Sequence, residues 1–187
     1  PAPDAAVAVA RLGLDVSLDS FIGDDEVGKE AIAYLNQQHV ETEDMLVEQG
    51  IKTSYYFVLR YGAERTILVK NEQFDYKWDP PVKKPDWVYL ALISDASWRY
   101  HEGLLAYLKD NPEIKLAFQP GTFHFKWGVE KLAEIYRRTH IIILNREEAV
   151  DITGRSYDSI RDLANGLHDL GPHIVVITDG PNGSYAS

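Results

Sequence analysis

The chain has 187 residues, 45% of them hydrophobic and 26% charged, which is ordinary for a soluble domain with a core of its own. It holds no cysteine, so disulfides, thiolate catalysis and cysteine-based metal sites are excluded. Its net charge of −10 argues against nucleic acid as a partner, because phosphate backbones need clustered lysine and arginine, and no apolar run approaches the roughly 20 residues of a membrane span.

The first quarter of the chain predicts two helices with a strand between them. Residues 4–12 are rich in alanine and valine and begin with Asp4, a capping residue, so they predict a short helix. Residues 16–22 alternate apolar and polar side chains, as a strand does. The sequence Gly23-Asp24-Asp25 then begins a second helix that we expect to reach about Gln38. The start of the chain shows no secretory signal, and we expect a cytoplasmic protein.

Residues 53–71 differ in character and predict a β-hairpin. Two runs rich in β-branched and aromatic residues, 55–59 and 66–69, flank a turn that contains Gly62. A two-stranded ribbon cannot bury its own aromatic side chains, and its exposed edges invite pairing. We therefore expect this hairpin to take part in a homodimer.

From residue 87 onward, apolar strands alternate with helical patterns. The helical patterns lie at about 102–108, 129–136 and 160–167, the last of them stopped by Gly171-Pro172, and the strands are expected at 87–93, 114–118, 141–144 and 174–177. This alternation predicts an α/β fold whose mostly parallel sheet carries helices on both faces. We expect residues 1–187 to form a single domain of this class, with the hairpin at about 53–71 outside its main sheet.

Polar residues and glycines follow each of these four strands. Ligands of open α/β sheets bind at the carboxyl ends of the strands, so this edge is where a site is expected. The segments that lie there are Ser94-Asp95, Gln119-Pro120-Gly121, Asn145 to Glu148, and Thr178-Asp179-Gly180.

Asn145 and Glu148 follow the most apolar strand with the spacing Asn-x-x-Glu. One interpretation is a capping box, in which Asn145 caps the next helix and Glu148 reaches back to it. The other is that both residues organise a water-coordinated Mg²⁺ beside phosphates, because hard cations prefer oxygen ligands. The spacing alone leaves both open.

The pattern Thr178-x-Gly180-x-x-Gly183 follows the last apolar strand. It offers a hydroxyl, free backbone N–H groups and a close approach to the backbone, which suit a nucleotide. It is equally typical of a tight turn that needs positive φ at glycine.

Other motifs have a structural and a functional interpretation as well. Gly23-Asp24-Asp25-x-x-Gly28 favours a strand exit, a helix cap and close packing. Arg60 and Arg65 are either solvated charges on the hairpin or part of a lid that meets an anionic group. Lys126-Trp127 favours surface packing, and the six histidines show no metal-ligand spacing.

In their order along the chain, these motifs resemble the ribokinase-like, phosphofructokinase-B type family of carbohydrate kinases. The family's Asn-Pro-Gly turn is similar to Gln119-Pro120-Gly121, and its Asn-x-x-Glu motif matches Asn145 to Glu148. The segments that resemble its N-terminal motif, its lid and its nucleotide loop are Asp4 with Gly13 and Gly23, Thr53 with residues 62–66, and Thr178 to Gly183.

The resemblance implies ATP-dependent phosphorylation of a sugar or sugar-acid hydroxyl, with Mg²⁺ as cofactor and K⁺ as an open question. On the substrate side it implies contacts from Asp4 and from Arg65 on the lid. On the nucleotide side it implies Asn145, Glu148, which would hold the metal through water, and the loop residues Thr178, Gly180 and Gly183.

Two departures from the family pattern stand out. Asp4 replaces an asparagine and adds a charge, and Gln119 replaces another. The resemblance also places the Gly-Ala-Gly-Asp motif, with the anion hole and catalytic base, after Ser187, and a first strand before Pro1. We therefore expect the fold to be incomplete at both ends, and no residue here is named as the general base. Alternative interpretations are a non-catalytic nucleotide- or sugar-binding member of the same fold, and a nucleoside kinase.

Overall fold

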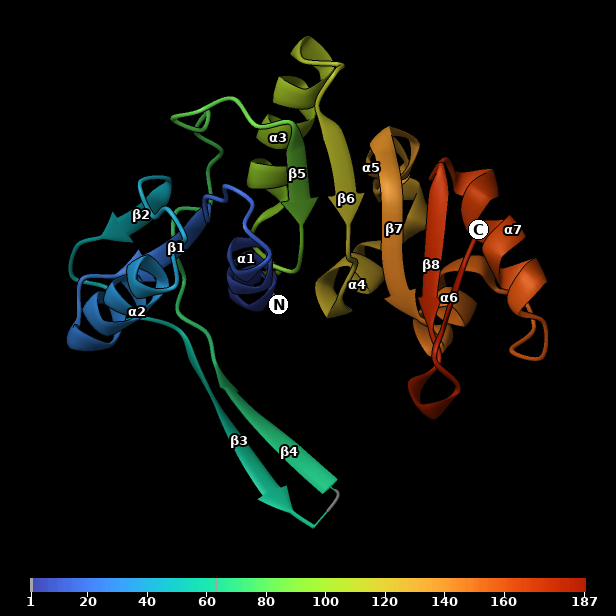
Figure 1. Cartoon of the computed structure of the whole chain (residues 1–187), viewed down its shortest axis with the longest axis horizontal. Coiled ribbons are helices and arrows are strands. Elements are labelled where there is room, and N and C mark those ends of the chain that lie inside the picture. The colour runs from blue at the N-terminus through green and yellow to red at the C-terminus, as the bar shows by residue number, and fades with distance from the viewer. Residues whose placement is uncertain (1, 63) are drawn as a thin grey trace. The chain divides into compact units, whose positions relative to one another are not determined.

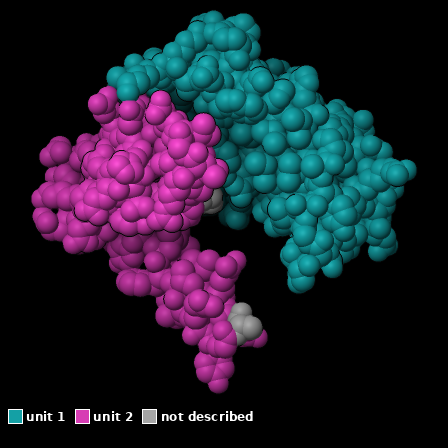
Figure 2. Space-filling model, in the orientation of Figure 1, with its two compact units in different colours: residues 1–2, 78–187 teal, residues 3–77 magenta. Residues whose placement is uncertain are grey.

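The computed structural model describes residues 2–62 and 64–187. Contacts divide it into two compact units, coloured separately in Figure 2: residues 78–187 together with Ala2 form unit 1, and residues 3–77 form unit 2. The predicted α/β class is confirmed, because parallel strands and crossover helices occur in both units. Among the described residues, every helix is too short or too polar to cross a membrane.

Unit 1 is built on a five-stranded sheet whose strands lie in sequence order. The first four strands are parallel and the fifth is antiparallel to its neighbour. The strands are β5 (Trp87–Leu90), β6 (Lys115–Phe118), β7 (Thr139–Asn145), β8 (Ile174–Thr178) and β9 (Ser184–Ala186). The sequence pattern missed β9, because three exposed residues are too few to show the alternation of a strand.

The connecting helices of unit 1 lie on one face of this sheet (Figure 1). They are α3 (Trp98–Asp110), α4 (Thr122–Lys131), α5 (Ala133–Arg138), α6 (Arg146–Thr153) and α7 (Ile160–Leu170). Right-handed crossovers between strands in sequence order always return on the same side, which explains the difference from the predicted coverage of both faces. The core lies between these helices and the sheet, where Phe118, Ile142 and Ile177 are fully buried.

Two glycines shape the helices of unit 1. Gly128 has φ of 81° and kinks α4, and the helical pattern of residues 129–136 is divided between the end of α4 and α5, which meet at Leu132. Gly171 ends α7, as its sequence predicted, with φ of 135°. A Cβ at Gly171 would lie 2.6 Å from the Cα of Arg137, so only glycine allows this close approach.

Unit 2 holds a small parallel sheet, two helices and the hairpin. Its elements are α1 (Ala2–Arg11), β1 (Ser20–Gly23), α2 (Glu26–Gln37), β2 (Met45–Glu48), β3 (Tyr55–Tyr61) and β4 (Glu64–Lys70). The strand predicted at residues 16–22 is confined to β1, with one isolated bridge at Ser17. Its partner β2 was not predicted.

Of the two helix caps predicted in unit 2, the structure contains one. The prediction that Asp4 caps the first helix is wrong, because α1 begins at Ala2 and Asp4 lies within its first turn, where a carboxylate suits the helix dipole. The cap predicted at Asp25 is confirmed, since its Oδ1 accepts the Gly28 N–H at 3.0 Å. Asp25 also accepts the Thr53 hydroxyl at 2.6 Å and the Thr53 N–H at 3.1 Å, and these bonds lower the pKa of Asp25.

The hairpin forms as predicted, with β3 and β4 antiparallel and paired along all seven residues of each strand. It is a separate two-stranded sheet, and every one of its strand residues is exposed. Tyr56, Phe57, Leu59 and Leu68 are among the exposed apolar side chains. Ala63, in its turn, lies outside the described residues.

Candidate functional site

Asn145 and Thr178 lie side by side at the carboxyl edge of the unit 1 sheet, where β7 and β8 end. They are direct partners in the register of these parallel strands. The Thr178 hydroxyl donates to the Leu144 carbonyl at 3.4 Å. The two motifs that sequence analysis placed at strand ends are therefore brought together by one strand pairing.

The capping box predicted for Asn145 and Glu148 is present. The Asn145 side-chain oxygen accepts the Glu148 N–H at 2.8 Å, and Glu148 Oε2 accepts the Asn145 N–H at 2.9 Å. Burial of the half-buried Glu148 carboxyl raises its pKa, and the nearby charges of Glu147 and Asp151 raise it further, while the Asn145 N–H opposes them. A cation beside this carboxyl would stabilise its charged form.

The loop after β8 is a tight turn with an open side. Gly180 and Gly183 have φ of 51° and 92°, so the predicted need for positive φ is confirmed. Asp179 N–H donates to the Gly183 carbonyl at 2.8 Å and closes the turn. A Cβ placed at Gly180 or Gly183 would meet no atom within 4 Å, which leaves free space beside the backbone for a ligand.

Arg146 connects this loop to the start of α6, a feature that sequence analysis missed. Its Nη1 lies 2.8 Å from Asp179 Oδ2, in an ion pair whose side chains are 15% and 6% exposed. Its Nε donates to the Tyr157 carbonyl at 2.9 Å, and the guanidinium lies 4.2 Å from the centre of the Tyr157 ring. Asp179 lies 33 residues from Arg146, too far for a local pattern to indicate the pair.

A buried histidine pair lies close to the carboxyl end of β6, where sequence analysis assigned no role to histidine. His101 of α3 and His124 of α4 are 0% and 1% exposed, and their Nε2 atoms are 3.0 Å apart. The Gly121 N–H donates to His124 Nδ1 at 3.1 Å, so His124 carries its proton on Nε2. His101 Nδ1 faces the Ser97 carbonyl at 2.8 Å and must donate to it, so its Nε2 accepts from His124.

This pair links the loop after β5 to the turn after β6 in neutral form. Burial lowers the pKa of His101, and the charge of Lys131 lowers it further while the bond to Ser97 opposes this. Burial, followed by the charge of His101, lowers the pKa of His124 to about 3. Trp127 packs edge-on against both imidazoles, in agreement with a packing role for Lys126-Trp127.

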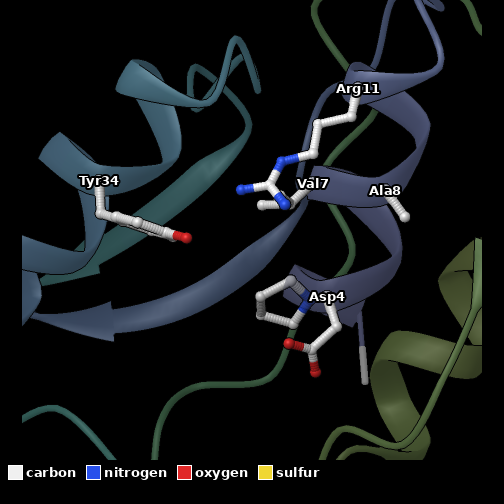
Figure 3. Close-up of a pocket in the computed structure, with 6 residues that line it drawn as sticks. Asp4, Val7, Ala8, Arg11 and Tyr34 are labelled. Atoms are coloured by element: carbon white, nitrogen blue, oxygen red, sulfur yellow. The ribbon is translucent and has the colours of Figure 1, made fainter.

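The residues predicted for the sugar side, Asp4 and Arg65, both belong to unit 2. Asp4 lines a hollow of about 370 Å³ between α1 and α2, and Figure 3 shows its carboxylate and the Arg11 guanidinium there with Tyr34. Arg65 lies near the hairpin tip, directly across the strand pair from Arg60. Arg65 lines a second, smaller hollow whose lining residues all come from the hairpin, so the two do not share a pocket.

Among the described residues, no three histidine, aspartate or glutamate side chains are placed to hold a metal ion by themselves. Asn145 and Glu148 offer side-chain oxygens at the unit 1 edge, and a cation there would need further ligands from water or substrate.

Comparison with known proteins supports the resemblance. The chain is 24% identical to a 5-dehydro-2-deoxygluconokinase of Bacillus subtilis over an alignment of 197 positions, which covers 97% of this chain and 61% of that protein. Its fold matches the fructokinase of Halothermothrix orenii, with a TM-score of 0.80 at 22% identity, over 99% of this chain and 69% of the other. It also matches a Vibrio cholerae fructokinase solved with fructose, ADP and calcium, with a TM-score of 0.79 at 21% identity, over 99% and 64%.

The chain thus spans about three fifths of the length of the curated relative. The model of the pfkB family carbohydrate kinases matches residues 5–187, which is nearly the whole chain. With the Asn145–Glu148 helix start and the Thr178–Gly183 turn adjacent at the carboxyl edge of the sheet, the chain belongs to the pfkB family of carbohydrate kinases.

Proposed function

We propose that the protein transfers the γ-phosphoryl group of ATP to a hydroxyl of a sugar or sugar acid. The observation that carries this proposal is the adjacency of Asn145 and Thr178, which places the capping box and the glycine turn at one edge of the sheet. Family membership supports it, as do the fructokinase solved with fructose and ADP and the relative named for a sugar acid.

The nucleotide side of the proposed site consists of Asn145, Glu148 and the turn Thr178–Gly183. The N–H groups at the start of α6 suit phosphate oxygens, and the glycines of the turn let phosphates approach its backbone, although the N–H groups of Asp179, Asn182 and Gly183 are used within the turn. Phosphoryl transfer depends mainly on positioning and charge neutralisation, which such donors provide. The Thr178 hydroxyl would add one more donor at the strand end by giving up its long bond to the Leu144 carbonyl.

The Glu148 carboxyl fits a role in holding Mg²⁺ through water. Glu148 Oε2 accepts a hydrogen bond from the Asn145 N–H, and we assign Glu148 Oε1 to a metal-bound water. Burial and neighbouring acidic groups raise the pKa of Glu148 because they disfavour its charged form. A cation nearby would stabilise that charged form. When bound, Mg²⁺ neutralises charge on the transferring phosphates.

The sugar side of the proposal rests on Asp4 and Arg65 of unit 2. A carboxylate at position 4 accepts hydrogen bonds from sugar hydroxyls, and an arginine on the hairpin suits a carboxylate or phosphate group. The cross-strand neighbour Arg60 adds a second positive charge next to Arg65. A sugar acid, such as the one in the name of the Bacillus relative, therefore belongs in the substrate panel.

The proposed activity is tested with the full-length gene product. ATP consumption is measured with Mg²⁺ against fructose, ribose, 2-keto-3-deoxygluconate, 5-dehydro-2-deoxygluconate and adenosine. Turnover with one sugar or sugar acid supports the proposal, and turnover with adenosine alone makes the protein a nucleoside kinase. Binding of ATP or sugar without turnover favours the non-catalytic alternative, and the absence of both turnover and binding rejects a ligand site. Omission of K⁺ shows whether a monovalent cation is needed.

We further propose that the hairpin mediates a homodimer. Its strands expose a continuous set of apolar side chains on a ribbon with two unpaired edges, a surface that favours association with a second copy. We also propose a cytoplasmic location for the protein, because the proposed reaction uses ATP as the phosphoryl donor.

A further inference from the structure

Arg146 occupies an unusual place, directly between the two motifs of the proposed nucleotide site. It is the first residue of α6, next to Asn145, and its side chain extends to the loop after β8. Its guanidinium contacts Asp179 through Nη1 and the Tyr157 carbonyl through Nε and Nη2. One side chain therefore joins three segments: the helix start, the 157 region and the glycine turn.

Asp179 links Arg146 to the glycine turn through hydrogen bonds. Its Oδ2 accepts from Arg146 and also from Asn182 Nδ2 at 3.2 Å. Its backbone N–H donates to the Gly183 carbonyl, and its carbonyl accepts the Asn182 N–H at 2.9 Å. Asn182 and Gly183, the last two residues of the turn, are thus held by a residue that is itself held by Arg146.

The chemistry of the ion pair favours positioning over phosphate binding. The guanidinium is mostly buried, and Asp179 neutralises its charge. Its fork makes three hydrogen bonds in fixed directions and stacks on the Tyr157 ring, a combination that lysine cannot reproduce. Loss of Arg146 alone would leave the Asp179 carboxylate buried and unpaired beside the phosphates of the nucleotide.

We propose that Arg146 is the positioning residue of the nucleotide loop, which it holds against the start of α6 through Asp179 and the Tyr157 carbonyl. This proposal rests on the proposed function, because it assumes that ATP binds along the turn Thr178–Gly183. It assigns no contact between Arg146 and the reacting atoms.

The test compares three changes at the pair with a matched control, all in the full-length gene product. Arg146→Met removes both the positive charge and the hydrogen bonds of the guanidinium. Arg146→Lys keeps the positive charge but not the planar set of donors, and Arg146→Met/Asp179→Asn removes the charges of both partners. The control is Arg155→Met, because Arg155 also forms an ion pair in unit 1, with Asp169 at 2.6 Å.

The expected result is a selective loss on the nucleotide side. Arg146→Met raises the Kd and the KM for ATP by about 10-fold or more, as expected for loss of a charged hydrogen bond, and leaves the KM for sugar within about 2-fold. The double variant recovers part of the ATP affinity because no unpaired charge remains, and Arg146→Lys recovers less than the wild type. Arg155→Met leaves the ATP affinity unchanged.

A second measurement tests how firmly the turn is held in the absence of any ligand. Hydrogen exchange at the Asp179 and Asn182 amides, which close the turn, becomes faster in Arg146→Met and stays as in the wild type in Arg155→Met. Unchanged exchange together with unchanged ATP affinity in folded Arg146→Met overturns the proposal. If the wild type binds no ATP, the proposed function fails, and the exchange measurement still decides whether Arg146 holds the turn.

Discussion

The hairpin of unit 2 and the carboxyl edge of the unit 1 sheet are both built from β-strands, but their strands are stabilised in different ways. In the sheet, Leu144 and Ile177 are buried beneath helices and the polar groups at the strand ends are paired within the unit. In the hairpin, every strand residue is exposed. The comparison indicates that the polar groups of the sheet edge are held in place within unit 1, whereas the hairpin leaves its apolar side chains unburied.

The largest expected contrast comes from truncating one apolar side chain in each region. Leu144→Ala should cost about 2–5 kcal/mol of the free energy of unfolding, because Leu144 is 2% exposed and its loss leaves a cavity. Phe57→Ala should change it by less than about 0.5 kcal/mol at dilution, because Phe57 is 59% exposed. Urea denaturation measures both, and equal losses would contradict the comparison.

Acid should weaken unit 1 through its histidine pair. The pKa of both His101 and His124 is lower in the folded state than in the unfolded chain, so the unfolded chain binds more protons below pH 6.5. The histidine contribution to stability should therefore be constant above this pH and fall as the pH decreases, by about 1.4 kcal/mol per pH unit for His124 down to its pKa of about 3, with a loss of the same sign from His101.

Urea denaturation at a series of pH values checks this expectation. His124→Gln is the matched variant, because its amide can accept from Gly121 and donate to His101 without titrating. It should flatten the acid limb of the curve, and an unchanged limb would show that His124 is not its source.

Glu148→Gln separates charge from capping at the sheet edge. Glutamine also serves in a capping box, so the midpoint of thermal unfolding should shift little. Loss of the carboxylate should lower kcat by about 100-fold, as for removal of one electrostatic contribution to the transition state. Wild-type turnover in the variant, measured by ATP consumption at saturating Mg²⁺, would exclude Glu148 from the metal's surroundings.

The hairpin should respond through association instead of folding. Phe57→Ser/Leu68→Ser alters two directly paired residues on one face of the ribbon. We expect the dimer dissociation constant to rise by at least about 10-fold, because a central apolar pair is lost from the interface. Sedimentation equilibrium measures it, with the exposed Leu12→Ser as control. A monomeric wild type at micromolar concentration would remove the homodimer from the account.

Sequence patterns predicted what is encoded locally. The Asn145 cap, the Gly171 helix end, the hairpin and the apolar strand before Asn145 each depend on residues a few positions apart, and all four are present. The cap expected at Asp4 failed because the helix begins two residues earlier.

The rest could not be predicted because it depends on distant partners. His101 and His124 are 23 residues apart, and the strands β2 and β9 have only four and three residues, so only their neighbours define them. The roles of Asn145, Glu148 and the turn toward a nucleotide stay predictions, since a capping box and a tight turn account for their geometry by themselves.

The central claim is that ATP binds at the carboxyl edge of the unit 1 sheet. The most direct measurement is an NMR titration of the isotope-labelled full-length gene product with Mg²⁺ and a non-hydrolysable ATP analogue. We expect the amide shift changes to concentrate at residues 145–148 and 178–183. Saturable binding with shifts elsewhere and none at these residues, or no binding at all, would contradict it.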